Sequence, residues 1–200
     1  MSQVNDTNSK VIEIFEQTGA YLHGHFRLTS GLHSPEYCQC ARVLQYPKFA
    51  EGFGKLLAEK FSEIAGGKQI AVVAAPAIGG LIIGHEVARA LGARFIFTER
   101  DASAKMTLRR GFQVEPGELA VVVEDVITTG GSLREAYEIM RAAGANVVAA
   151  GSIIDRSGGR ADLGLKRVAL ATLQVTTYAP ELCPLCRVGQ PIVKPGSRPS

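Results

Sequence analysis

VVVEDVITTGGS, residues Val121–Ser132, is the most informative stretch of this chain. Its three consecutive valines are typical of a strand that is buried on both faces, as in a parallel sheet. Two carboxylates, Glu124 and Asp125, follow the valines, and a Thr/Gly/Ser turn then leads into a helical pattern that begins at Leu133. The segment therefore predicts a strand, a turn and a helix in direct succession, with acids at the end of the strand.

The turn is suited to binding a phosphorylated sugar. At the start of a helix the backbone N–H groups have no helical partner, and the helix dipole favours negative charge there. Gly130 and Gly131 let a ligand approach the backbone closely, and the hydroxyl groups of Thr128, Thr129 and Ser132 add hydrogen-bond donors. The two carboxylates can accept hydrogen bonds from two ribose hydroxyls or lie near a metal ion. The alternative is an ordinary strand-to-helix turn without a ligand.

The whole segment resembles, without a gap, the phosphoribosyl-pyrophosphate (PRPP) signature of the type I phosphoribosyltransferases. The resemblance implies that Glu124 and Asp125 bind the ribose 2′- and 3′-hydroxyls and that Thr128–Ser132 surround the 5′-phosphate. The full set of PRPP-binding residues that it implies is Arg100, Lys105, Glu124, Asp125, Val126, Ile127, Thr128, Thr129, Gly130, Gly131 and Ser132.

Length and composition are those of an ordinary globular domain. The chain has 200 residues, of which 46% are hydrophobic and 20% are charged. The first residues are polar, and the longest apolar stretch, 70–84, is interrupted by Pro76 and glycines, so we expect a cytoplasmic protein without a membrane partner. The net charge of +3 and the lack of a dense Lys/Arg run predict no nucleic-acid partner.

Strand and helix patterns alternate through most of the chain, which predicts an α/β fold with a doubly wound, mainly parallel sheet. We expect one domain over 1–200, with a core over about 46–175 and a small hood subdomain formed by about 1–45 and part of the C-terminal tail. The expected strands are 70–75, 94–98, 119–124, 147–154 and 168–173, and the expected helices are 11–19, 47–66, 81–91 and 132–143. The remaining expectations are disorder over 1–9, short strands outside the main sheet within 21–37, and an extended or frayed tail over 183–200.

Ligands of such sheets bind beyond the carboxyl ends of the strands. Three informative stretches, 76–80, 124–132 and 155–160, fall there, and we expect them to form a single site. The first is a small-residue turn whose backbone N–H groups can lie against a pyrophosphate group, unless it is a tight turn without a ligand. The residues of this predicted pyrophosphate loop are Ala77, Ile78, Gly79 and Gly80.

The polar segment 99–118 is long for a connection without a function. Four cations in it, Arg100, Lys105, Arg109 and Arg110, can close over a leaving pyrophosphate, exclude water and neutralise the developing charge. The alternative is a solvated β-hairpin with surface arginines.

An arginine at the end of a strand, Arg156, can bind a ligand carboxylate in a two-pronged contact. The alternative is a surface salt bridge with Asp155 or Asp162. The stretch Leu28–Tyr37 can form a lid over a base, although some of its apolar residues are also expected in a core.

The four cysteines occur as two pairs, Cys38-x-Cys40 and Cys183-x-x-Cys186, which suggests a zinc site. The first spacing is unusual for zinc and the pairs lie far apart, so we favour free or structural thiols. Three histidines show no spacing typical of a metal site: His23, His25 and His33.

Further segments resemble the orotate phosphoribosyltransferases, and this resemblance covers about Val11 to Arg198. Ile154–Arg156 matches the arginine that binds the orotate carboxylate in that family. The other matching segments are Phe26–Gly31 with Ser34-Pro35, the loop Lys105–Phe112 of one bacterial branch, and the tail segments Cys183–Cys186 and Lys194–Arg198 of that same branch.

The resemblance implies transfer of the phosphoribosyl group of PRPP to orotate, with Mg²⁺ held mainly through PRPP and no metal ligand from the protein. It implies catalytic roles for Lys105, Arg109 and Asp125 and contacts of Thr128 and Arg156 with orotate. It also implies a homodimer whose 99–118 loop reaches the neighbouring site.

Some positions depart from the family pattern. Many members carry a Lys at the position of Thr29, a Tyr-Lys pair at Ile78-Gly79, and further Lys and His residues in the loop after Asp101. Arg109 or Arg110 is expected to replace the missing loop cations. Two other functions are open: a purine phosphoribosyltransferase, which has no use for a carboxylate-binding arginine, and a non-catalytic PRPP-sensing regulator, which needs no cationic loop.

Overall fold

The computed structural model of the chain describes residues 2–28 and 30–195. The helices are α1 (Ser2–Gln17), α2 (Cys40–Leu44), α3 (Pro47–Ala65), α4 (Gly80–Leu91), α5 (Gly131–Ala142), the 3₁₀ turn η1 (Pro180–Leu182) and α6 (Pro184–Arg187). The strands are β1 (Tyr21–Arg27), β2 (His33–Cys38), β3 (Val72–Pro76), β4 (Arg94–Arg100), β5 (Met106–Leu108), β6 (Leu119–Ile127), β7 (Asn146–Asp155) and β8 (Lys166–Thr172).

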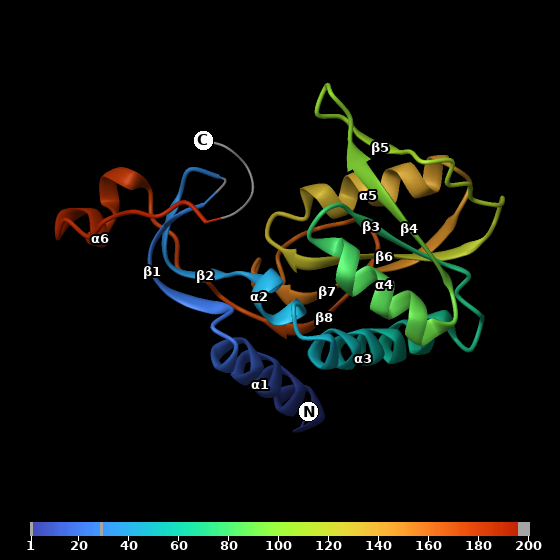
Figure 1. Cartoon of the computed structure of the whole chain (residues 1–200), viewed down its shortest axis with the longest axis horizontal. Coiled ribbons are helices and arrows are strands. Elements are labelled where there is room, and N and C mark those ends of the chain that lie inside the picture. The colour runs from blue at the N-terminus through green and yellow to red at the C-terminus, as the bar shows by residue number, and fades with distance from the viewer. Residues whose placement is uncertain (1, 29, 196–200) are drawn as a thin grey trace.

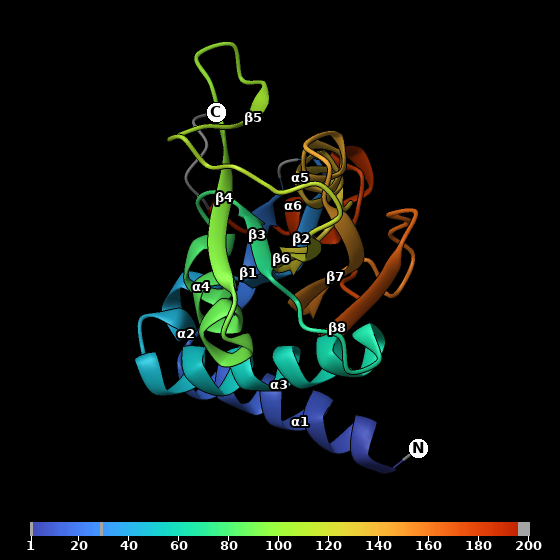
Figure 2. The same ribbon diagram turned by 90° about the vertical axis from the view of Figure 1, so that its right-hand side faces the viewer.

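The main sheet has six strands in the order β5-β4-β3-β6-β7-β8. Neighbouring strands from β4 to β8 are parallel, and the short β5 pairs antiparallel with β4. Figures 1 and 2 show this twisted sheet with helices on both sides. The predicted doubly wound, mainly parallel α/β fold is confirmed.

Two apolar clusters, one on each face of the sheet, form the core. On one face α3 and α4 pack through residues such as Phe61 and Ile83 against Val121 and Val123. On the other face α5 packs through Leu133 and Met140. The valines of β6 alternate between the two clusters, which explains why a central strand of this sheet needs apolar residues in succession rather than in alternation.

Local signals set several element boundaries as expected. Pro47 is the first residue of α3, where its missing N–H costs nothing. Gly66 ends α3 and Gly92 ends α4, both in the left-handed conformation with φ of 61° and 64°.

The predicted disorder of residues 1–9 is wrong, because α1 begins at Ser2, although residue 1 lies outside the described part. Val11 and Phe15 are buried in the core cluster that includes α3, and Asn8 Oδ1 accepts a hydrogen bond of 2.8 Å from the backbone N–H of Thr172. The helix expected over 11–19 is therefore present, and tertiary contacts extend it over the polar residues before Val11.

The expected strands outside the main sheet are present, since β1 and β2 form a separate antiparallel hairpin. The C-terminal tail, residues 173–195, returns to this hairpin (Figure 1). His33 and Tyr178 exchange two backbone hydrogen bonds of 2.9 Å, and Val193 donates a backbone hydrogen bond of 2.8 Å to His25. The tail over 183–200 was predicted to be extended or frayed, but α6 forms within it, and its last part, 196–200, lies outside the described residues. No described helix is both long and apolar enough to cross a bilayer.

Candidate active site

The strand order reverses between β3 and β6, because the chain continues from β3 toward β4 and from β6 toward β7 and β8. A crevice forms at such a switch point, outside the carboxyl ends of the two strands. A cavity of about 890 Å³ extends from the end of β6 to the β1–β2 hairpin and the tail. This volume is within the range of small-molecule sites.

The acidic pair at the end of β6 lines the cavity. Oδ1 of Asp125 accepts a hydrogen bond of 2.8 Å from the backbone N–H of Val126. Burial raises the pKa of the Asp125 carboxyl above its ordinary value, and the hydrogen bond from Val126 opposes this shift. The pair thus places carboxylate acceptors at the point where the sheet opens.

The turn after β6 forms the adjoining wall, with Thr128, Thr129, Gly130, Gly131 and Ser132 all lining the cavity. No side chain caps the N-terminus of α5, so its first N–H groups are available to an anion. Gly130 has φ of 78°, and a Cβ at this position would lie 2.6 Å from Cδ2 of Leu163. Glycine is therefore required for the conformation and for the space.

Ile127, which the sequence places in the same segment, is fully buried and packs in the cluster under α5. It does not line the cavity, whereas Val126 does.

The turn Pro76–Gly80 lies beside the acidic pair rather than on the cavity wall, since none of its residues lines the cavity. A Cβ at Gly79 would lie 2.7 Å from Oδ1 of Asp125. The backbone N–H of Ala77 donates to the carbonyl of Thr98 over 2.7 Å, and the peptide bond between Ala77 and Ile78 is cis. The stretches 124–132 and 155–160 thus meet at the cavity as expected. The stretch 76–80 does not line the cavity, but Gly79 lies against the carboxylate of Asp125, which does.

Arg156 lines the cavity without an acidic partner. Its guanidinium lies over the ring of Tyr37, 5.5 Å from the centroid, and its Nε is buried with no hydrogen-bond partner. Within 2–28 and 30–195 no carboxylate forms an ion pair with it, and Asp155 instead accepts hydrogen bonds from Ser157 and lies 3.4 Å from Nη2 of Arg167. The alternative, a salt bridge of Arg156 with Asp155 or Asp162, is therefore wrong. The guanidinium group of Arg156 can bind a ligand carboxylate through two parallel hydrogen bonds.

The segment 99–118 contains the β4–β5 hairpin, so the alternative reading as a hairpin describes its geometry correctly. Asp101 Oδ1 holds the turn by accepting hydrogen bonds from Ser103 and from the backbone N–H of Lys105. These hydrogen bonds from Ser103 and Lys105 lower the pKa of the Asp101 carboxyl. Figures 1 and 2 show that the hairpin projects away from the sheet.

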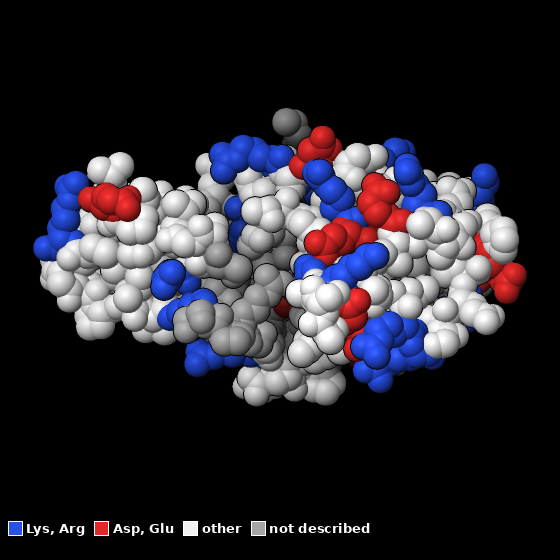
Figure 3. All heavy atoms as spheres, turned by 90° about the horizontal axis from the view of Figure 1, so that it is seen from above, with Lys and Arg blue, Asp and Glu red and all other residues white. Residues whose placement is uncertain are grey.

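The loop cations differ in their distance from the cavity. Arg100 lines it and forms an ion pair of 2.9 Å with Glu135, whereas Lys105 and Arg109 do not line it. Arg110 pairs with Glu99 over 3.0 Å and lies over the ring of Phe97. On the face seen in Figure 3, Lys and Arg alternate with Asp and Glu over the core.

Several cavity residues have no clear signal in the sequence. Tyr37 lies in the segment that was expected to form a lid. Glu135, in contrast, has the sequence pattern of an exposed helix residue, and the tail residues were not expected to reach the site. Thr29, where many members of the resembling family carry a Lys, lies outside the described residues. The cavity-lining residues that the prediction did not include are Cys38, Gln39, Cys40, Glu135, Val175, Thr177, Lys194 and Pro195, among others.

Comparison with known proteins agrees with this geometry. A family model described as "Phosphoribosyl transferase domain" matches residues 39–170. Among curated relatives, the orotate phosphoribosyltransferase of Pelotomaculum thermopropionicum is 55% identical over 192 residues, which are 96% of this chain and 98% of that protein. The orotate phosphoribosyltransferase of Desulforamulus reducens is 51% identical over 189 residues, which are 94% and 96% of the two chains.

Solved structures agree as well. The orotate phosphoribosyltransferase of Aeropyrum pernix has a TM-score of 0.64 and 28% identity, covering 81% of this chain and 93% of its own. A phosphoribosyltransferase from Corynebacterium diphtheriae has a TM-score of 0.65 and 26% identity, covering 84% and 97%. The chain therefore belongs to the phosphoribosyl transferase family and, within it, to the orotate phosphoribosyltransferases.

Proposed function

We propose that this protein transfers the 5-phosphoribosyl group of PRPP to orotate, giving orotidine 5′-monophosphate and pyrophosphate in pyrimidine nucleotide synthesis. The observation that carries the orotate assignment is Arg156, whose buried Nε has no partner in the described protein. The same cavity holds the acidic pair and the glycine turn, so a carboxylate-bearing base and a sugar phosphate can bind side by side.

Each wall of the cavity has a proposed role. Glu124 and Asp125 accept hydrogen bonds from the ribose hydroxyls, and the turn 128–132 binds the 5′-phosphate at the start of α5. Arg156 binds the orotate carboxylate with the help of Thr128, and the ring of Tyr37 holds the guanidinium in place by a cation–π contact.

The proposed pyrophosphate side of the site is formed by the turn 77–80 and the loop cations. Arg100 is the cation nearest to it, because it already lines the cavity. Its present partner Glu135 lies on the first part of α5, and exchange of this exposed ion pair for the leaving pyrophosphate costs little, about 0–1 kcal/mol.

Rate enhancement in this proposal comes from orientation and from electrostatic stabilisation rather than from a covalent intermediate. C1′ of the ribose becomes cation-like as the pyrophosphate leaves, and N1 of orotate must lie on the opposite side of it. Mg²⁺ would be held mainly through PRPP and would supply positive charge next to the pyrophosphate. The carboxylates of Glu124 and Asp125 are oxygen donors of the kind that Mg²⁺ prefers, which fits this cofactor.

We propose that the active form is a cytoplasmic homodimer. Lys105 and Arg109 were expected to be catalytic, yet they lie on the projecting β4–β5 hairpin and do not line the cavity of their own chain. A hairpin that extends from the sheet can deliver these cations to the cavity of a second copy.

One experiment tests the proposal against its alternatives. The protein is incubated with PRPP, Mg²⁺ and, in separate reactions, orotate, uracil, adenine or hypoxanthine, and pyrophosphate release is measured. Release with orotate supports the proposal. Release only with adenine or hypoxanthine identifies a purine phosphoribosyltransferase, and binding of PRPP without release with any base identifies a PRPP-sensing regulator.

A further inference from the structure

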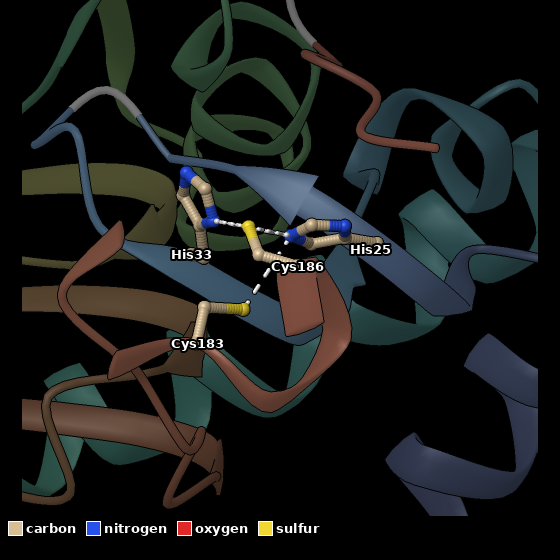
Figure 4. Close-up of side chains that lie close together, drawn as sticks. All are labelled: His25, His33, Cys183 and Cys186. Atoms are coloured by element: carbon tan, nitrogen blue, oxygen red, sulfur yellow. Dashed lines mark hydrogen bonds between the residues drawn. The ribbon is translucent and has the colours of Figure 1, made fainter. Parts of the chain in front are cut away.

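Four potential metal ligands meet where the β1–β2 hairpin contacts the tail, away from the cavity walls. They are His25 of β1, His33 of β2, Cys183 just before α6 and Cys186 within α6, and their donor atoms all lie within 4.8 Å of one another. Figure 4 shows both imidazoles and both sulfurs pointing toward a common centre. Three of the four side chains are buried, and Cys186 is on the surface side.

Four of the six distances between these donors match the edges of a tetrahedral zinc site, and the other two are within 4.8 Å. Zinc bonds of about 2.3 Å to sulfur and about 2.0–2.1 Å to nitrogen imply edges of about 3.3 Å between nitrogens and about 3.6 Å between nitrogen and sulfur. Nε2 of His25 and Nδ1 of His33 are 3.1 Å apart. The nitrogen–sulfur distances are 3.3 Å from His33 to Cys186, and 3.5 Å and 3.7 Å from His25 to Cys183 and Cys186.

A second hydrogen bond orients one of the ligands. Nδ1 of His25 lies 2.8 Å from the backbone carbonyl of Gln190, which is an acceptor only, so Nδ1 carries the proton and donates. Nε2 is then the nitrogen with the free lone pair, and it faces the two sulfurs and His33. Metal-bound histidines are held in this way, by donation of the other ring N–H to a carbonyl or carboxylate.

The tail around the cluster has little apolar packing of its own. Leu182 and Val188, on either side of the two cysteines, are 65% and 76% exposed, and α6 has no buried residue. Two imidazoles and two thiols thus occupy the centre of a segment where a core of apolar side chains would be expected. A bound ion is an efficient way to stabilise such a small unit.

From this geometry we infer that His25, His33, Cys183 and Cys186 bind a structural zinc ion that joins the β1–β2 hairpin to the C-terminal tail. All four positions of the ion are filled by the protein, so the site has no open position for catalysis. The same hairpin and tail supply Leu28, Leu32 and Lys194 to the cavity, so the ion holds one wall of the substrate site in place.

The four cysteines do not form the zinc site that their pairing in the sequence suggests. Cys38 and Cys40 line the substrate cavity and take no part in the cluster of Cys183 and Cys186. The histidines were set aside for lack of spacing, because an antiparallel hairpin brings His25 and His33 together without any helical or C-x-x-C pattern.

Metal content is the direct test. Protein produced in zinc-supplemented medium is dialysed and its zinc measured by mass spectrometry, with about one ion per chain expected. The double variant Cys183→Ser/Cys186→Ser and the single variant His33→Asn should lose this zinc, whereas the matched controls Cys38→Ser and His85→Asn should keep it. Zinc at the same stoichiometry in the double variant would overturn the inference.

A second measurement uses only the wild-type protein, so it does not depend on whether a variant folds. Protein stripped of metal with a chelator under reducing conditions is titrated with Co²⁺, and the absorption bands of tetrahedral, thiolate-bound cobalt should appear and saturate at about one equivalent. Zinc should then displace cobalt and protect two of the four thiols from a thiol reagent. Absence of the bands in the wild-type protein, together with equal reactivity of all thiols with and without zinc, would show that the four side chains form only a hydrogen-bonded cluster.

Discussion

Replacement of Arg156 by alanine tests the orotate assignment most directly. Its guanidinium is half-buried, lies over the ring of Tyr37, and has a buried Nε with no hydrogen-bond partner in the described part of the chain. Removal of one member of a buried charge pair costs about 2–5 kcal/mol of binding. Because Arg156 is only half-buried, water can partly replace it, and we expect the lower part of this range, about 2–3 kcal/mol, which is a rise of roughly 30- to 150-fold in the KM for orotate.

The stability of the folded protein should not fall along with orotate binding. The free protein already bears the cost of an unsatisfied Nε, about 1–3 kcal/mol, and the variant removes it along with a cation–π contact worth about 0.5–1 kcal/mol. The assay is steady-state formation of orotidine 5′-monophosphate with orotate and PRPP varied in turn, together with thermal unfolding.

Two matched variants complete this test. Arg156→Lys keeps the positive charge but cannot donate two parallel hydrogen bonds to a carboxylate, and it should give an intermediate KM for orotate. Arg141→Ala, on the exposed face of α5, removes an arginine whose one ion pair among the described residues is with Glu138, and it should leave both KM values unchanged. An unchanged orotate KM in Arg156→Ala, or an equal rise in the KM for PRPP, would refute the role of this side chain.

Four further outcomes are expected. Asp125→Asn should reduce kcat/KM for PRPP by at least tenfold, about 1.4 kcal/mol, while orotate binding measured by calorimetry stays the same; a normal PRPP response would contradict its role. The pKa of Asp125 is raised in the folded protein, so the ionised carboxylate destabilises the fold at pH values above its usual pKa of 3.8. Asp125→Asn should therefore raise the free energy of unfolding, measured with denaturant, at neutral pH but not below pH 3.8. A gain in stability that does not vary with pH would argue against the effect of burial. Gly79→Ala would place a methyl group 2.7 Å from Asp125 and should lower activity, whereas Gly52→Ala, with free space in α3, should keep activity and stabilise by about 1 kcal/mol; equal activity of the two variants would mean that the turn 76–80 tolerates displacement. The Lys105→Ala and Asp125→Asn variants should each be nearly inactive. If both chains are mixed and reassembled, half of the dimers contain one chain of each kind, and one of the two sites in such a dimer has both Lys105 and Asp125, so about a quarter of wild-type activity should return. No recovery would place Lys105 in the site of its own chain.

Most of the fold followed from local patterns in the chain. The valine run of β6, the proline that begins α3 and the glycines that end α3 and α4 each act through neighbouring residues, so a single sequence is enough to place them. The same holds for the turn after β6, since its acids, hydroxyls and glycines are adjacent in the chain. The helix over 11–19 was expected from its apolar spacing, but its N-terminal extension over 2–9 was not, because that extension is polar and depends on contacts with distant elements, such as the hydrogen bond between Asn8 and Thr172.

The distances between groups far apart in sequence depended on tertiary structure. The position of Arg156 after a strand made it a candidate ligand-binding residue. The sequence left open whether Arg156 pairs with Asp155, and in the structure Asp155 pairs with Arg167 instead, which leaves Arg156 open to a ligand. Lys105 and Arg109 read as active-site cations, yet the Asp101 turn fixes them in a hairpin that projects from their own site.

The sequence by itself therefore determined the five parallel strands of the sheet, the helices α3, α4 and α5 and the phosphate-binding turn, because those depend on residues that are neighbours along the chain. The tertiary structure alone decided which side chains outside that turn share the cavity and which four come together at the base of the tail. Contacts of this second kind depend on how a hairpin, a crossover and a C-terminal segment are brought together, and the free energy that brings them together is spread over the whole core.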